Sequence, residues 1–294
     1  MRLKVFGLFL AIQLFSLGLW YGLNYQSAQQ DVLAAAPENA SEFPRLKENL
    51  GGSSSPLSAS NTTPVSDTDL VEKEDAYKIT VRNWEDQHQT LYETQVGMIE
   101  KVVHVLPVDH TENLEIVLDY DTEAHRGWGG EGIVILAAAK MPMEELIAVM
   151  VHEIGHHVDA AFLNHTNEKF PSAYYDREQV VYSDDPSVAF YNLSWMNNKE
   201  RRSGDHSDSV SGYGVTTIHE DFAETFAFYV LHGQEFEFLS KMNPVLKQKY
   251  DFMKNTVFEG RVFEDTFSSV QTEKRPWDVT RLDYNLNTFL LMNG

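Results

Sequence analysis

The chain has 294 residues, of which 43% are hydrophobic and 12% aromatic, so it can bury a core of ordinary size. Its net charge of −21 repels a phosphate backbone, argues against nucleic acid as a partner and favours basic or neutral partners. The chain has no cysteine, which excludes disulfides, thiolate catalysis and cysteine-ligated zinc. Any metal ion must therefore be held by His, Asp or Glu.

Residues 1–25 carry Arg2 and Lys4 ahead of an apolar run from Val5 to Leu23. Positive charge followed by an apolar run is typical of an export signal. The run of 19 residues is also about long enough to cross a bilayer. Two interpretations stay open, a cleaved signal peptide and a retained amino-terminal membrane anchor. Both predict that the rest of the chain is secreted or held at the cell surface.

Residues 26–75 are rich in Ser, Thr, Asn, Gly and Pro and almost free of aromatic residues. A segment of this composition buries too little apolar surface to order itself. We expect a flexible linker over 26–75, followed by one folded domain of ordinary size over 76–294.

Within 76–294, apolar residues recur at the spacing of a helix in some segments and at the spacing of a strand in others. An amphipathic helix is expected around Val96 and Ile99, and "NLEIVLDYD" alternates as a strand. "GWGGEGIVILAA" is expected to be a glycine-flanked strand, and "MPMEELIAVMVHEIGHHVDAAFL" a long helix that begins at Pro142. After a long loop over 170–212, helices are expected over "TTIHEDFAETFAFYVLHG", closed by Gly233, and over "NPVLKQKYDFMKNTVF". The pattern predicts an α+β fold, with a small twisted sheet packed on one helix and a mostly helical carboxyl-terminal lobe.

The long helix carries the sequence H-E-x-x-H. On a helix, His152 and His156 project from one face one turn apart, so both imidazoles can bind one metal ion. Glu153 lies beside them, where a carboxylate can accept a proton from a water molecule on the metal. His157 points about 100° away from that face and is interpreted as a packing residue. Asp159 is a candidate to accept a hydrogen bond from His156.

Such a metal ion needs a third protein ligand. Two other classes of H-E-x-x-H peptidase would place a histidine at 162 or an aspartate at 210, but this chain has Phe162 and Val210. The helix "HEDFAETFAFYV" offers Glu220 and Glu224, one turn apart on one face. One can bind the metal and the other can support a ligand histidine, and the spacing on the helix leaves both assignments open. His219 points away from this face by the same geometry.

The segments "HEIGHHVD", "SGYG", "HEDFAETFAFYVL" and "NPVLKQKYDFMKNTVF" resemble the peptidase domains of the anthrax lethal factor family, which includes the secreted Pro-Pro endopeptidases. The resemblance implies a zincin-like fold, one catalytic Zn²⁺ and hydrolysis of peptide bonds. In that family a tyrosine seven residues before the glutamate ligand stabilises the transition state, and Tyr213 stands seven before Glu220. The resemblance thus implies that Glu220 is the ligand and Glu224 the supporting residue. The 64 residues between His156 and Glu220 are longer than expected for the family, so substrate preference stays open.

The sequence thus predicts an exported zinc endopeptidase that acts on a protein or peptide. We expect the substrate to pair with the strand "GEGIVILAA" as an added edge strand, with Trp128, Gly130 and Gly132 along its path. Two alternatives stay open. One is a zinc exopeptidase, and the other is a surface-tethered binding module with a structural or degenerate zinc site. A structural site would have four protein ligands, whereas the sequence supplies three.

Overall fold

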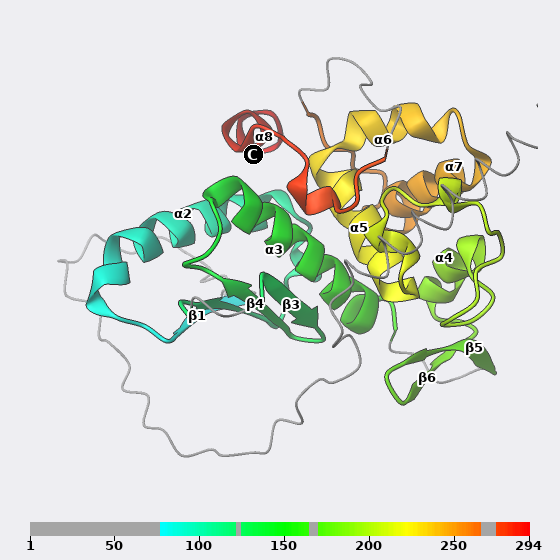
Figure 1. Cartoon of the computed structure of the whole chain (residues 1–294), viewed down its shortest axis with the longest axis horizontal. Coiled ribbons are helices and arrows are strands. Elements are labelled where there is room, and N and C mark those ends of the chain that lie inside the picture. The colour runs from blue at the N-terminus through cyan, green and yellow to red at the C-terminus, as the bar shows by residue number, and fades with distance from the viewer. Residues whose placement is uncertain (1–76, 122–124, 165–169, 266–274) are drawn as a thin grey trace, which may run out of the picture. The chain divides into compact units, whose positions relative to one another are not determined.

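The computed structural model describes residues 77–121, 125–164, 170–265 and 275–294 (Figure 1). All of them belong to one unit, Asp69–Gly294. The signal or anchor predicted over 1–25 and the linker predicted over 26–75 lie outside the described residues. Within the described ranges, no helix combines the length and the apolar character needed to cross a bilayer.

A four-stranded sheet forms the amino-terminal part of the unit. Its strands lie in the order β1-β2-β4-β3, and their bounds are β1 Tyr77–Arg82, β2 Leu114–Asp119, β4 Ile133–Ala137 and β3 Gly127–Gly130. The first three strands are parallel, and β3 runs antiparallel to β4. Helix α2 (Gln89–Val105) connects β1 to β2, as a parallel pair requires. The tight turn between β3 and β4 contains Gly132 with φ of 73°, a left-handed conformation that favours glycine.

Helices α2 and α3 (Met143–His157) lie along one side of this sheet (Figure 1). Pro142 precedes the first turn of α3, as predicted, and the chain continues beyond His157 as a π-helix, Val158–Phe162. On the face toward α3, Val134 and Leu136 are buried and pair across the strands with Gly129 and Gly127. The opposite face carries Trp128, which is paired with Ile135.

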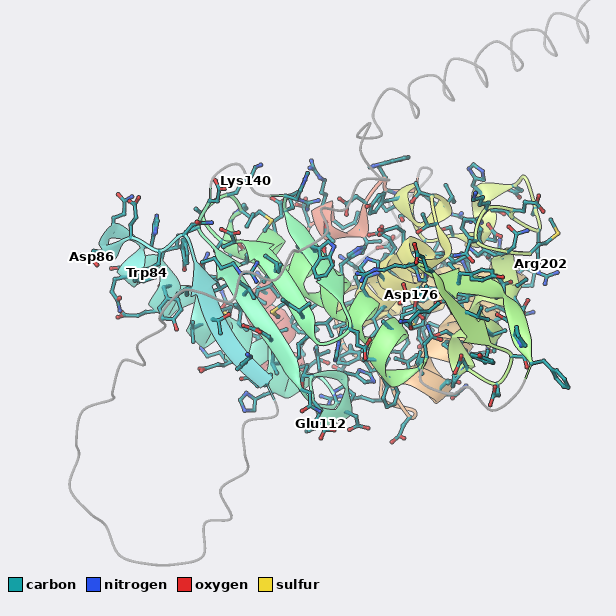
Figure 2. All side chains as sticks on the ribbon, turned by 90° about the horizontal axis from the view of Figure 1, so that it is seen from below. Trp84, Asp86, Glu112, Lys140, Asp176 and Arg202 are labelled. Carbon is teal, nitrogen blue, oxygen red and sulfur yellow. The ribbon has the colours of Figure 1, made fainter. Side chains whose placement is uncertain are left out.

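The rest of the unit is mostly helical. Its helices are α4 Pro186–Ser194, α5 Ile218–Leu231, α6 Gly233–Ser240, α7 Pro244–Phe252 and α8 Leu286–Asn293. Trp84 and Asp86 lie at the sheet end of the unit, and Arg202 lies at the helical end (Figure 2). Every residue of α5 is buried except His219 and Glu220. A Cβ on Gly155 of α3 would lie 3.0 Å from the Ala223 Cα of α5, so a glycine there lets the two helices approach closely.

The predicted α+β class is confirmed, as are the helices around Val96 and after Pro142. The helix predicted over "NPVLKQKYDFMKNTVF" is α7 as far as Phe252 and continues as a π-helix, Met253–Val257. Two predicted boundaries are wrong. The loop predicted over 170–212 contains α4 and a hairpin of β5 (Pro171–Asp176) and β6 (Gln179–Tyr182). Gly233 does not close α5, because that helix ends at Leu231 and α6 begins at Gly233.

The strand predicted from "GWGGEGIVILAA" is in fact the hairpin of β3 and β4. β4 has a neighbour on each side, so it cannot accept an added strand as we expected. In β4 the side chains of Val134 and Leu136 are fully buried on the face toward α3, whereas those of Ile133 and Ile135 on the opposite face are half-buried. Of the two strands in this hairpin, β3 lies at the edge of the sheet, and its glycines gave it too little strand propensity to be recognised.

Candidate metal centre

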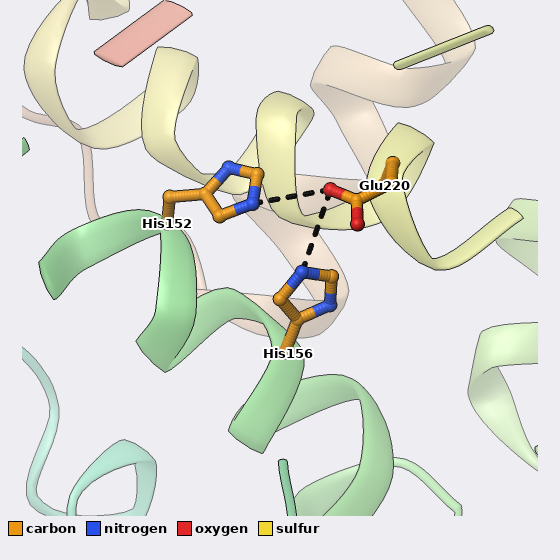
Figure 3. Close-up of side chains that lie close together, drawn as sticks. All are labelled: His152, His156 and Glu220. Atoms are coloured by element: carbon orange, nitrogen blue, oxygen red, sulfur yellow. Dashed lines mark ion pairs between the residues drawn. The ribbon is translucent and has the colours of Figure 1, made fainter. Parts of the chain in front are cut away.

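The three predicted ligands come together between α3 and α5 (Figure 3). His152 and His156 project from successive turns of α3, and Glu220 from the first turn of α5. The Glu220 Oε2 atom lies 3.2 Å from Nε2 of His152 and 3.5 Å from Nε2 of His156. These three residues could hold a metal ion.

The spacing of these atoms suits a tetrahedral ion. Ligand atoms bound at about 2.1 Å in a tetrahedron lie about 3.4 Å apart, close to both distances at Glu220. Glu220 Oε2 is buried and has no hydrogen-bond partner among the described residues, so its lone pairs are available to a cation. Three ligands leave a fourth position for water.

The electrostatics of the group favour positive charge. Burial lowers the pKa of His152, but the carboxylates of Glu220 and Glu224 outweigh burial and hold that pKa well above its usual value. Burial likewise raises the pKa of Glu220, but His156 and His152 outweigh it, so that pKa lies far below its usual range. The carboxylates of Glu220 and Glu224 attract a metal ion for the same reason that they attract a proton. A divalent cation bound here would therefore neutralise their negative charge.

Glu224 lies in the predicted supporting position behind His152. Its Oε1 atom lies 3.0 Å from Nδ1 of His152, and its carboxylate is fully buried. The backbone N–H of Val279 donates to Glu224 Oε2 at 2.9 Å. With Nδ1 held by Glu224, the Nε2 atom of His152 is directed toward Glu220.

Glu153 is seated against β3. A Cβ on Gly129 would lie 2.8 Å from Glu153 Oε2 and 2.5 Å from its backbone oxygen, and a Cβ on Gly127 would meet Oε1. Burial raises the pKa of Glu153, although His152 and His156 lower it. A more basic carboxylate accepts a proton more readily. Gly127 and Gly129 were missed by the sequence analysis, although glycines at alternate strand positions indicate close approach of another group.

The ring of Tyr213 lies beside the ring of His152, and the two centroids are 6.2 Å apart. Burial, together with the carboxylate of Glu220, raises the pKa of Tyr213 well above its usual value. The phenol therefore keeps its proton and can donate a hydrogen bond. The backbone N–H of Tyr213 donates to the Trp277 carbonyl at 2.6 Å, which holds the residue in place.

Residues 275–281, which we call the carboxyl-terminal strap, tie these groups together. The strap binds Tyr213 through Trp277 and Glu224 through Val279. Arg126, just before β3, lies 2.8 Å from the carboxylate of Asp278 and 2.8 Å from that of Glu145 in α3. The strap was missed by the sequence analysis, because a contact made through a backbone N–H or C=O carries no mark of its own in the sequence.

Asp159 does not support His156 as predicted. Its carboxylate accepts hydrogen bonds from Ser187 Oγ at 2.5 Å and from the Tyr191 hydroxyl at 2.6 Å. His219 lies 3.3 Å from the same carboxylate, away from the metal ligands, which agrees with its predicted orientation. Both hydroxyl donors to Asp159 come from α4, so this carboxylate joins the end of α3 to α4.

His157 and the predicted substrate residues gather at the β3–β4 hairpin. The backbone N–H of Gly132 donates to His157 Nδ1 at 2.9 Å, so His157 anchors the turn and stays outside the ligand group. A Cβ on Gly130 would lie 3.7 Å from the ring of Trp128. Trp128 and Gly130 therefore share the sheet face opposite α3.

The chain thus brings His152, His156 and Glu220 to one point, with Glu153 and Tyr213 beside them. No protein-family model matches this chain, and no curated protein matches it. The geometry of the site is therefore the basis on which a function can be assigned.

Proposed function

We propose that this protein is a zinc-dependent endopeptidase with a zincin-like fold. The observation that carries the proposal is the convergence of His152, His156 and Glu220 within 4.8 Å of one another. Two imidazoles and one carboxylate are a typical donor set for catalytic zinc, which keeps a fourth position open. A structural zinc site would instead be closed by a fourth protein ligand.

The residues around the ligands suit peptide hydrolysis. A bound Zn²⁺ would polarise the substrate carbonyl and lower the pKa of a water molecule. Glu153 accepts the proton of the attacking water and delivers it to the departing amine. Tyr213 donates its hydroxyl proton in a hydrogen bond to the oxygen that gains negative charge. Glu224 keeps His152 oriented throughout.

The free edge of β3 supplies a path for the substrate. An extended peptide can add to an exposed strand edge through backbone hydrogen bonds. β3 has β4 on one side only, and its Gly129 lies against Glu153. A peptide laid along this edge extends past the reacting bond in both directions, which favours cleavage within a chain over removal of terminal residues.

The test is cleavage of a peptide library by the full chain, with metal content measured on the same samples. Glu153→Gln should keep its zinc and lose turnover, and Tyr213→Phe should lose roughly 10²–10³ in kcat. His152→Ala should lose the metal itself. Cleavage by Glu153→Gln at the wild-type rate would overturn the proposal. A zinc-loaded wild type that cleaves no peptide would instead support a binding module.

We also propose that the enzyme works outside the cytoplasm. The support is the order of Arg2 and Lys4 before the apolar run from Val5 to Leu23. Cell fractionation with amino-terminal sequencing of the exported form would separate a cleaved signal peptide from a retained anchor. Recovery of the full-length chain in the cytoplasm alone would contradict export.

A further inference from the structure

The β5–β6 hairpin brings a cation to the edge strand of the sheet. Figure 2 shows the hairpin beside the sheet, with Asp176 at the end of β5. The next residue is Arg177, whose guanidinium carbon lies 5.8 Å from the centroid of the Trp128 ring on β3. One of its terminal nitrogens lies 3.8 Å from the position that a Cβ on Gly130 would take. Arg177 therefore lies over the face of β3 opposite α3.

Among the described residues, none pairs with the charge of Arg177. No described residue forms a hydrogen bond or an ion pair with its guanidinium, which is exposed and contacts only an aromatic ring. Arg126 and Arg201, by comparison, are both paired with carboxylates. In a chain with a net charge of −21, an unpaired arginine beside the proposed substrate path is a group that an external anion can bind.

Arg177 is also close to the reacting groups. Gly129 lies against the Glu153 carboxylate, and Gly130, one residue further along β3, lies beside Arg177. One residue of a strand spans about 3.4 Å. Side chains alternate between the two faces of a strand, so a peptide paired with β3 would direct every second side chain toward Arg177. In such a peptide, one residue directs its side chain toward Glu153. The neighbouring residue directs its side chain toward the opposite face, where Arg177 lies.

We infer that Arg177 is a specificity-determining residue, which selects peptides with an aspartate or glutamate side chain beside the bond that is cut. The inference rests on the proposed endopeptidase function and names its substrate class. A guanidinium binds a carboxylate through two parallel N–H···O bonds, a geometry that a neutral amide side chain cannot match. The Trp128 ring holds the guanidinium by a cation–π contact and limits its orientations.

The experiment compares kcat/KM for peptides that differ at one residue, which is glutamate, glutamine or lysine. The varied residue is placed in turn on each side of the cut bond, and both peptide ends are blocked, so the side chain is the only carboxylate that changes. The wild-type full chain should cleave the glutamate peptide roughly 10-fold faster than the glutamine peptide at one of these positions. Arg177→Gln should remove this preference, and Arg177→Glu should favour the lysine peptide instead. The readout is the ratio of the glutamate rate to the glutamine rate within each protein, so a general change in activity does not affect it.

Arg82→Gln is the matched control, because it removes one positive charge from β1, at the opposite edge of the sheet. It should leave the preference for glutamate unchanged. Equal rates for glutamate and glutamine peptides in the wild type would overturn this inference and leave the endopeptidase proposal standing. A preference for the glutamate peptide that Arg177→Gln retains would overturn it as well. Failure of the zinc-loaded wild type to cleave any of the three peptides would overturn the endopeptidase proposal itself.

Discussion

His152 Nδ1 lies 3.0 Å from the Oε1 atom of Glu224, a carboxylate with no exposed surface. The other oxygen of Glu224 accepts the backbone N–H of Val279. One side chain of α5 thus fixes the orientation of His152, a candidate metal ligand on α3, and joins it to the carboxyl-terminal strap.

The first prediction replaces this carboxylate with an amide, in Glu224→Gln. A glutamine side chain has one acceptor oxygen for the two groups that Glu224 serves, so one of them loses its partner. We expect metal affinity to fall about 10- to 100-fold, as is typical when the group behind a ligand histidine is removed. Competition with a chromogenic chelator measures this. An unchanged affinity would show that Glu224 does not orient His152.

The second prediction concerns the contact between β3 and Glu153. In Gly129→Ala, the new methyl group would lie 2.8 Å from Glu153 Oε2 and 2.5 Å from its backbone oxygen, so the carboxylate has to move. We expect a loss of turnover, because the contact with the backbone oxygen of Glu153 forces β3 and α3 apart and moves the carboxylate. Metal content is measured on the same samples. Gly97→Ala is the control, since nothing lies within 4 Å of the added methyl in the middle of α2. It should keep full activity and gain roughly 0.5–1 kcal/mol of stability. Full activity in Gly129→Ala would refute the proposed seat of Glu153.

The third prediction tests a buried ion pair behind the ligand turn of α5. Asp221 follows Glu220, and its two oxygens both lie 2.6 Å from Nζ of Lys249, with neither side chain exposed. In Lys249→Met the carboxylate loses its cation inside the protein, so we expect a loss of about 3–5 kcal/mol in the free energy of unfolding. Lys247→Met removes an exposed lysine that pairs with Asp251 on the same helix and should cost about 0.5 kcal/mol or less. Urea denaturation of both variants measures the difference, and equal losses would contradict the assignment.

The fourth prediction is a loss of stability in acid. Burial lowers the pKa of His110 and of His232 from 6.5 to about 4. Between pH 6.5 and pH 4 the folded protein keeps both rings neutral, whereas the unfolded chain takes up protons on them. Their contribution to stability is therefore complete above pH 6.5 and is lost as the pH falls toward 4.

Replacing one of these histidines should make the free energy of unfolding depend less steeply on pH. His232→Phe should lose about 2 kcal/mol less stability than the wild type between pH 7 and pH 5. Both proteins are unfolded in urea with a chelator present, so that metal release contributes to neither measurement. Identical slopes for the two proteins would show that His232 titrates alike in the folded and unfolded chain.

The residues that the sequence predicted best are those whose roles depend on helical spacing. His152 and His156 are four positions apart on α3, and Glu220 and Glu224 are four apart on α5, so helix geometry alone places each pair on one face. The α+β class followed for the same reason, because hydrophobic periods distinguish helices from strands. The sequence could not show that Ser187 and Tyr191 of α4 lie beside Asp159, and so it assigned that carboxylate to the wrong partner.

The features that the sequence missed depend on contacts between distant segments. The edge position of β3 follows from how the hairpin packs in the sheet, and no local pattern indicates it. The contact of Arg177 with Trp128 joins residues on two separate hairpins. The bonds from Val279 and Trp277 are made by backbone groups, which every residue other than proline possesses in the same form.

The carboxyl-terminal strap has a consequence for the timing of activity during synthesis. Translation proceeds from the amino terminus, so His152, Glu153 and Glu220 leave the ribosome well before Trp277 and Val279 do. Until those two residues emerge, Glu224 and Tyr213 lack the backbone partners that hold them beside His152. A nascent chain would therefore carry His152, Glu153 and Glu220 without an organised set of groups around them, and any activity of this site would begin only after residues 277 and 279 have left the ribosome.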